Sequence, residues 1–177
     1  GIKAGDALIA LPSSGVHSNG YSLVRSVVRA SGLGWNDDAP FAPGETLGGA
    51  LLRPTALYVN TVMALHARGL LHGCAHITGG GLPGNLPRVF PEGLGARIEA
   101  STWPIPPVFQ WLAQVGDIAP DEMLRVFNCG VGMVLITPDP DAVLAELHAR
   151  GEVGYMIGSV IESDTAYALN GTPDFGA

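Results

Sequence analysis

Lysine is nearly missing from this chain: Lys3 is the only one, and the eight arginines are scattered along the sequence. The formal net charge is −7, and no clustered basic face is visible. Because nucleic-acid binding depends on such a face to neutralise phosphates, we expect no nucleic-acid partner. An anionic ligand would have to be held locally, by backbone amides and one or two arginines.

Cysteine is also scarce. Cys74 and Cys129 are too few for a disulfide framework, and they lack the paired spacing of a metal site. We expect both to be reduced, buried thiols. No apolar stretch reaches the length of a membrane span, and no basic-then-apolar leader is visible. We therefore expect a cytoplasmic setting and no membrane partner.

Apolar residues, in contrast, make up 47% of the chain, and charged residues only 14%. This composition supplies enough apolar surface for one folded domain and argues against disorder. The chain opens at Gly1 without a methionine and leads directly into the apolar run Ala7–Leu11. From that start we expect a part of a longer protein, folded as a single domain over residues 1–177.

Apolar periodicity and glycine or proline breaks divide the chain into strands and helices. Strands are predicted at Ala7–Leu11, His72–Ile77, Gly95–Glu99, Val131–Ile136, Tyr155–Ile161 and Thr165–Leu169, the last two as a hairpin. Helices are predicted from about Ser18 to Gly32, Pro54 to Arg68, Leu82 to Val89, Pro107 to Val115, Asp121 to Phe127 and Asp139 to Arg150. Residues 33–50 read as an irregular connection. The predicted fold class is α+β (α/β-like), with a mixed β-sheet packed with helices.

Polar and glycine residues interrupt these elements at three places, of which Ser13–Arg25 is the first. A strand end, a hydroxyl-rich loop and a helix start place free backbone amides around one point, which suits an anion such as phosphate. His17 can donate to a phosphate oxygen or transfer a proton. In the alternative reading, Ser18 or Asn19 caps the helix and His17 is a surface loop residue.

The second place is the glycine triplet in His76-Ile77-Thr78-Gly79-Gly80-Gly81. Three glycines after a strand let the backbone approach a ligand closely. The segment fits neither the Walker loop nor the dinucleotide fingerprint. The alternative is a flexible turn, with His76 as a structural histidine.

The third place is Phe127-Asn128-Cys129-Gly130-Val131-Gly132-Met133. Small residues that lead into a strand indicate close packing. No nearby base supports Cys129 as a nucleophile, so Asn128 is the better candidate for a polar contact. No metal-binding motif is present, and we predict no metal ligand in this chain.

Four ordered blocks carry a resemblance to a known family: Ser13–Arg25, Leu52–Thr55, His76–Gly81 and Phe127–Met133. Together they resemble the second half of the aminoimidazole ribonucleotide synthetases (phosphoribosylformylglycinamidine cyclo-ligases), over nearly the whole chain. The resemblance implies a homodimer of two-domain subunits. The N-terminal domain, which would lie upstream of Gly1, builds the dimer and most of the ATP and Mg²⁺ site.

The implied reaction is the ATP-dependent cyclisation of formylglycinamidine ribonucleotide in purine biosynthesis. ATP phosphorylates the formamide oxygen, a nitrogen attacks the same carbon, and phosphate leaves as the imidazole ring closes. On this chain the resemblance assigns His17 and His76 to proton transfer or phosphate contact. It assigns substrate or phosphate binding to Asn19, Gly20, Thr78, Gly79, Gly80 and Gly81, with Ser14 and Asn128 as further candidates. We expect the chain alone to fold but not to catalyse.

Two other readings remain open. One is a related ATP-using enzyme on the same two-domain plan: formylglycinamidine ribonucleotide synthetase, thiamine-monophosphate kinase, selenophosphate synthetase or a hydrogenase-maturation protein. The other is a non-catalytic binding domain that retains the fold.

Overall fold

The apolar run near the N-terminus forms a strand in the middle of a sheet. In the computed structural model, which describes residues 1–176, β1 (Ala7–Pro12) pairs with a neighbour on each side. Leu8, Ile9, Ala10 and Leu11 are at most 2% exposed. The strand is covered on both faces, which explains why its sequence is continuously apolar.

The other strands are β2 (Gly73–His76), β3 (Leu94–Glu99), β4 (Val131–Thr137), β5 (Tyr155–Glu162) and β6 (Tyr167–Asn170). They form one six-stranded sheet in the order β2-β4-β1-β5-β3-β6. Every pairing is antiparallel except β3 with β6, which is parallel. The predicted mixed sheet of an α+β fold is confirmed.

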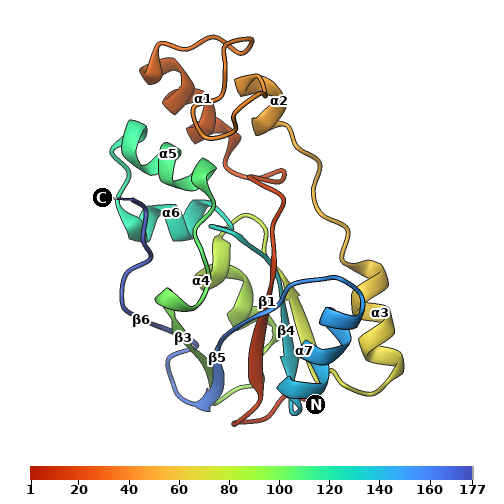
Figure 1. Cartoon of the computed structure of the whole chain (residues 1–177). Helices are drawn as coiled ribbons and strands as arrows, with labels where there is room; N and C mark the ends of the chain where they lie inside the picture. The colour runs from red at the N-terminus through yellow and green to blue at the C-terminus, as the bar shows by residue number, and fades with distance from the viewer. Residues whose placement is uncertain (177) are drawn as a thin grey trace.

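Helices cover both faces of this sheet (Figure 1). The helices are α1 (Tyr21–Ser31), α2 (Leu47–Leu51), α3 (Val59–Ala67), α4 (Gly81–Asn85), α5 (Pro107–Gly116), α6 (Pro120–Val126) and α7 (Pro140–Ala149), with short 3₁₀ turns η1 (Leu86–Val89) and η2 (Ala100–Thr102). Side chains alternate along β1: Leu8 and Ala10 join the larger core with α1, α2, α4, α5 and α6. Ile9 and Leu11 face α3 and α7. No helix within residues 1–176 has the length and apolar character needed to cross a membrane.

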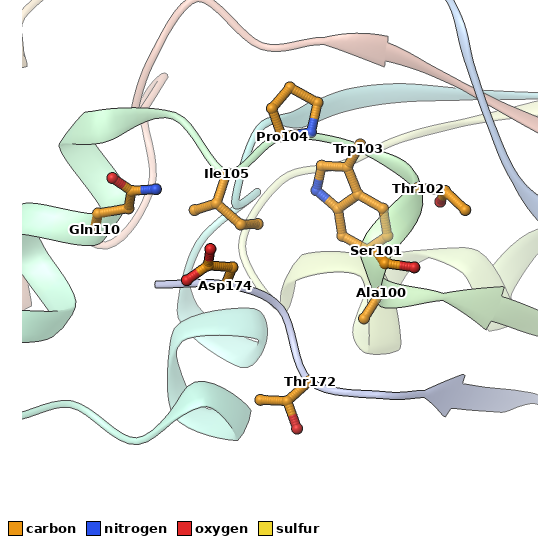
Figure 2. A pocket seen from close by; sticks show the side chains of 9 residues that line it. All are labelled: Ala100, Ser101, Thr102, Trp103, Pro104, Ile105, Gln110, Thr172 and Asp174. Carbon is orange, nitrogen blue, oxygen red and sulfur yellow. The ribbon is translucent and has the colours of Figure 1, made fainter. Parts of the chain in front are cut away.

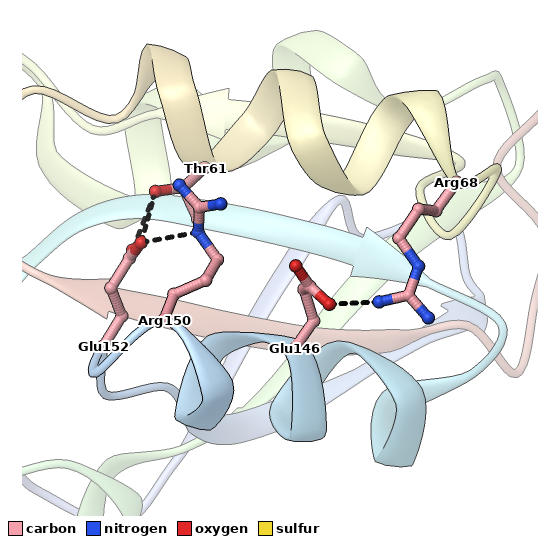
Figure 3. A network of polar contacts seen from close by, with 5 residues as sticks. All are labelled: Thr61, Arg68, Glu146, Arg150 and Glu152. Carbon is pink, nitrogen blue, oxygen red and sulfur yellow. Dashed lines mark hydrogen bonds and ion pairs between the residues drawn. The ribbon is translucent and has the colours of Figure 1, made fainter.

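A polar network joins α3 to the chain that follows α7 (Figure 3). Thr61, only 4% exposed, donates its hydroxyl to the Glu152 carboxylate, with oxygen–oxygen distances of 2.7 and 2.8 Å. Arg150 donates to the same carboxylate at 2.9 Å, and Arg68 pairs with Glu146 further along the two helices. The network fixes how α3 lies against α7.

The predicted C-terminal hairpin is wrong. β5 and β6 follow one another in sequence, but β5 already pairs with β1 along one edge and with β3 along the other. The last strand therefore passes β5 and pairs with the free edge of β3, parallel to it. A short connection is typical of hairpins, but the occupied edges decide the outcome.

The predicted helix start at Pro54 is also wrong, because α3 begins at Val59. Residues 52–58 instead form an extended connection, which we call the strap. The Pro54 carbonyl accepts from the Ser14 hydroxyl at 2.6 Å, and the Ala56 amide donates to Nε2 of His17 at 3.4 Å. Ser14 and His17 lie in the loop between β1 and α1 (residues 13–20), which we call the first loop. The bonds to this loop take the place of the first turn of a helix.

Candidate ligand site at the end of the sheet

Strand register brings the three polar segments together. Pro12, the last residue of β1, pairs with Val131, the first residue of β4. His76, the last residue of β2, pairs with Met133 on the other side of β4. Because β4 is antiparallel to both neighbours, the loops that follow β1 and β2 and the segment that precedes β4 meet at one end of the sheet.

Asn128 fastens two of these segments to each other. Its side chain is buried, at 2% exposure, and its Nδ2 donates to the Gly15 carbonyl at 2.9 Å. Its Oδ1 accepts from the Gly130 amide at 2.9 Å, and the Ser13 amide donates to the Gly130 carbonyl at the same distance. Both ends of the amide are therefore used inside the protein, so Asn128 positions the first loop.

Cys129 packs beside Asn128 as a buried thiol. It is 0% exposed, and burial raises its pKa well above the usual range. A thiol held neutral in this way is a poor nucleophile, in agreement with the sequence analysis. Cys74 is only half-buried, so the prediction of two buried thiols holds for one of them.

The last residue of the glycine triplet, Gly81, must be a glycine for a structural reason. It has a φ of 58°, and a Cβ at this position would lie 1.8 Å from the carbonyl oxygen of Leu124 on α6. Gly20 has a φ of 75° and would place a Cβ 2.3 Å from the ring of Phe127. Both glycines allow backbone to approach backbone or core, and both loops therefore rest against α6 and its C-terminal end.

The first two loops adjoin each other. The Oδ1 of Asn19 lies 3.4 Å from the position that a Cβ would take on Gly79. Gly79 is exposed and Asn19 is half-buried, so both face the surface at this junction. The two segments predicted to bind phosphate are thus neighbours.

Asn85 stabilises the conformation of residues 78–81, which we call the glycine loop. Sequence reasoning missed this role. Its Nδ2 lies 2.7 Å from the Gly81 carbonyl and 3.3 Å from the carbonyls of Thr78 and Gly79, and donates to them. Its Oδ1 accepts from the Thr78 hydroxyl at 3.1 Å. The available signal was a polar residue, Asn85, inside the helix predicted from Leu82 to Val89. These bonds join residues 78–81 to α4 through one side chain.

His17 is buried, at 4% exposure, so the alternative reading of a surface loop residue is wrong. Helix α1 has Gly20 at its N-cap and no side-chain cap, which also overturns capping by Ser18 or Asn19. Nε2 of His17 accepts from the Ser14 amide at 3.1 Å and from the Ala56 amide at 3.4 Å. Nδ1 is buried without a hydrogen-bond partner among residues 1–176.

Burial lowers the pKa of His17 to about 4, and the neighbouring His76 adds to the shift. The ring is therefore neutral at neutral pH. Because Nε2 accepts two amides, the hydrogen of the neutral ring belongs on Nδ1.

Tyr58 lies between the two predicted histidines and was not found from the sequence. Its ring centroid is 6.4 Å from that of His17 and 6.0 Å, edge-on, from that of His76. Its hydroxyl donates to the Pro12 carbonyl at 2.7 Å, and burial raises its pKa to about 12. Gly132 makes room for it, since a Cβ there would lie 1.8 Å from the Tyr58 hydroxyl.

His76 is exposed at the end of β2. It borders an apolar hollow of about 320 Å³, whose other walls include Tyr58, Met63 and Met133. A second hollow, of about 360 Å³, borders the first half of the strap. Its lining is His17, Ser18, Tyr21, Arg25, Leu52, Arg53, Pro54 and Thr55. The strap residue Thr55 borders both hollows.

A larger hollow of about 550 Å³ lies elsewhere, between η2, the start of α5 and the C-terminal segment (Figure 2). Figure 2 shows the Trp103 indole, the Gln110 amide and the Asp174 carboxylate around it, and among the described residues that line it Asp174 alone is charged. None of the three polar segments lines it. Size alone therefore does not select the site. Among the described residues 1–176, no group of three His, Cys, Asp or Glu side chains is placed to hold a metal ion.

The chain was compared with known protein families and solved structures. Residues 3–168 match the family described as AIR synthase related protein, C-terminal domain. Thiamine-monophosphate kinase from Stenotrophomonas maltophilia K279a shares the fold with a TM-score of 0.62 at 16% identity, over 98% of this chain and 52% of that one. E. coli HypE gives 0.59 at 21% identity, over 98% and 50%. T. maritima PurL complexed with AMPPCP gives 0.52 at 14% identity, over 96% and 23%.

This chain spans about half or less of the length of each of these solved structures. At such low identities the structural likeness shows the fold alone. The family match is more specific, because it covers nearly the whole chain. The chain belongs to the AIR synthase related family, as its C-terminal domain.

Proposed function

We propose that this chain is the C-terminal domain of a phosphoribosylformylglycinamidine cyclo-ligase, the enzyme that closes the imidazole ring of aminoimidazole ribonucleotide. The observation that carries the proposal is the meeting of the four resembling blocks at one end of the sheet. Three of these blocks reach the surface at this end of the sheet, and the buried fourth block, Phe127–Met133, supports the first of them through Asn128. Such a meeting of distant blocks is expected if they serve one substrate. The family match supports the same placement.

The two histidines differ in what they can do. His17 is neutral, and its Nε2 is occupied by two backbone amides. We therefore assign it to holding the first loop and the strap. His76 is exposed, so solvent and substrate can reach its ring. We assign His76 as the group that moves a proton when nitrogen attacks the activated carbon.

Phosphate oxygens need hydrogen-bond donors, and the two adjoining loops supply them. We propose that Asn19, Gly20, Thr78 and the triplet Gly79–Gly81 form the substrate-binding loops, with Asn19, Gly79 and Gly80 nearest the substrate. The Thr78 hydroxyl already donates to Asn85 and the Gly81 amide to the Thr78 carbonyl, so these two residues act by shaping the loop. The first amides of α1 follow Gly20 directly and receive no side-chain cap from residues 1–176, so they remain available to an anion. Ser14 and Asn128 act through the loop, since their side chains bond the carbonyls of Pro54 and Gly15.

ATP and Mg²⁺ belong, in this proposal, mainly to a domain that precedes this chain. The site residues named here carry no carboxylate, and hard cations such as Mg²⁺ require carboxylate or phosphate oxygens. This chain alone therefore does not fit the ion. A kinase and an AMPPCP-bound protein among the solved structures support use of ATP. The whole enzyme would be a cytoplasmic homodimer.

Turnover by the full-length protein tests the proposal. With ATP and formylglycinamidine ribonucleotide, it should form the imidazole product, and the 177-residue chain alone should form none. The same protein should be offered thiamine monophosphate and selenide with ATP. Product from either of these acceptors, and none from formylglycinamidine ribonucleotide, would overturn the cyclo-ligase assignment while leaving the family intact.

A further inference from the structure

The hollow of about 360 Å³ beside the first loop is unusual for its charge. Two of the nine basic residues of the chain, Arg25 and Arg53, line it, and no acidic residue does. The whole chain carries a formal charge of −7. A local positive site in an acidic protein favours one small anion over general attraction to polyanions.

The two arginines are presented differently. Arg25 lies on α1 and forms no ion pair within residues 1–176, so its guanidinium is available. Arg53 lies on the strap, where Glu45 accepts from its Nε and Nη2. This side-on pair leaves Nη1 free and fixes the plane of the guanidinium. An arginine held in this way loses less side-chain freedom when an anion binds.

Neutral groups complete the hollow. The hydroxyls of Ser18 and Thr55 line it and form no hydrogen bond within the described part of the chain, residues 1–176. The Tyr21 hydroxyl is already engaged, at 2.6 Å from the Leu51 carbonyl and 3.0 Å from the His17 carbonyl. Tyr21 is therefore a wall that ties α1 to Leu51, the last residue of α2, directly before the strap. With His17 neutral, the arginines are the only charged groups of the lining among residues 1–176. Glu45 pairs with Arg53 from outside the lining, so the unpaired charge of the hollow is that of Arg25.

We infer that this hollow binds the phosphate group of a phosphate monoester, with Arg25 and Arg53 as its two charged donors. Guanidinium groups bind phosphate through paired, charge-assisted hydrogen bonds. Its volume exceeds that of a phosphate group, which leaves room for part of an attached sugar. The apolar hollow beside His76 and the hollow around Asp174 offer no cation, so neither competes for this ligand.

The identity of the ester rests on the proposed function, which makes it the 5′-phosphate of a ribonucleotide. In this respect the inference deepens that function. The anion site itself follows from Arg25, Arg53 and the hollow. It therefore predicts binding by this chain without turnover.

The test is calorimetric titration of the 177-residue chain with inorganic phosphate and with ribose 5-phosphate, at pH 7.5 and low salt. Wild type should bind ribose 5-phosphate saturably. Arg25→Gln and Arg53→Gln should each weaken binding about tenfold or more, because each removes a charge-assisted hydrogen bond. Arg29→Gln is the matched control: Arg29 is exposed on the same helix but does not line the hollow, and it should change binding less than about twofold.

Absence of saturable binding of both probes by the wild type would overturn the inference. Equal losses in the Arg25, Arg53 and Arg29 variants would also overturn it, since they would show diffuse attraction. Circular dichroism of each variant checks the fold; these arginines are exposed at the surface, so folding should not change. Binding without cyclo-ligase turnover by the full-length protein would retain this site and reject the proposed function. Cyclo-ligase turnover by the full-length protein, without binding of either probe by this chain, would retain the proposed function and reject this site.

Discussion

The Ala56 amide donates to Nε2 of His17 across 39 positions of sequence, at 3.4 Å. The same nitrogen accepts from the Ser14 amide at 3.1 Å. One imidazole ring therefore holds the first loop and the strap, and it can do so only while Nε2 carries no proton. The geometry of the loop is tied to the protonation state of a single residue.

Acid should loosen this part of the fold. The pKa of His17 is about 4 in the folded chain, against an ordinary value of 6.5. Between these values the unfolded chain binds the proton more tightly, so the stability from this group is complete above pH 6.5 and is lost as the pH falls toward 4. His17→Asn has no such titration, and asparagine tolerates the φ of 59° at this position.

Urea unfolding at pH 7 and pH 4.5 measures the effect. The free energy of unfolding of wild type should fall by on the order of 2 kcal/mol more than that of His17→Asn. Exposed His148 supplies the control, and His148→Asn should follow wild type. Parallel pH curves for wild type and His17→Asn would contradict the assignment of a neutral, buried ring.

Gly81→Ala should destabilise the chain strongly. The new Cβ would meet the Leu124 carbonyl oxygen at 1.8 Å, and the φ of 58° is unfavourable for alanine. We expect a loss of about 3 kcal/mol or more in the free energy of unfolding. Gly84→Ala, in the same helix and with nothing within 4 Å of its Cβ, should be neutral or stabilising by about 1 kcal/mol. Similar melting temperatures for the two variants would refute the close approach of α4 to α6.

The variant Asn128→Asp tests the hydrogen bonds by which Asn128 joins the first loop to the start of β4. It removes the donor to the Gly15 carbonyl and buries a carboxylate at a site that is 2% exposed. The expected cost is about 3 kcal/mol, measured by urea unfolding at pH 7. Asn36→Asp makes the same change at an exposed position and should cost less than about 0.5 kcal/mol. If both variants unfold at the same urea concentration, the Asn128 hydrogen bonds contribute nothing to stability.

Thr61→Val tests the network between α3 and α7. It keeps the shape of the buried side chain but removes the hydroxyl that donates to Glu152. Loss of a hydrogen bond to a carboxylate should cost about 1.5–3 kcal/mol. Thr61→Ser keeps the hydroxyl and should cost about 1 kcal/mol, for the missing methyl group. A thermal-unfolding series in which the serine variant is the less stable of the two would reject the role of the hydroxyl.

Strands and loops with strong local signals could be predicted from the sequence. The buried strand at Ala7–Leu11, the mixed sheet and the positions of the three polar segments follow from apolar runs and glycine breaks. That the segments meet depends on register along β4, which no local pattern contains. The strap illustrates the limit: Pro54 suits a helix start, but its carbonyl bonds Ser14, 40 positions earlier.

The charged hollow was beyond sequence reasoning for the same reason. Arg25 and Arg53 belong to different elements, and both line the hollow only in the folded chain, where Tyr21 of α1 bonds Leu51 just before the strap. Tyr58 and Asn85 carry no motif of their own. Their importance comes from contacts with the histidines and the glycine loop, which exist only in the folded chain.

The most direct test of the central claim is the turnover number of the full-length protein with His76→Ala, assayed with formylglycinamidine ribonucleotide and ATP. If this end of the sheet is the active site and His76 moves the proton, kcat should fall by about two orders of magnitude or more. His66→Ala, at an exposed position on α3 outside the site, should retain full activity. Full activity in both variants would contradict the account.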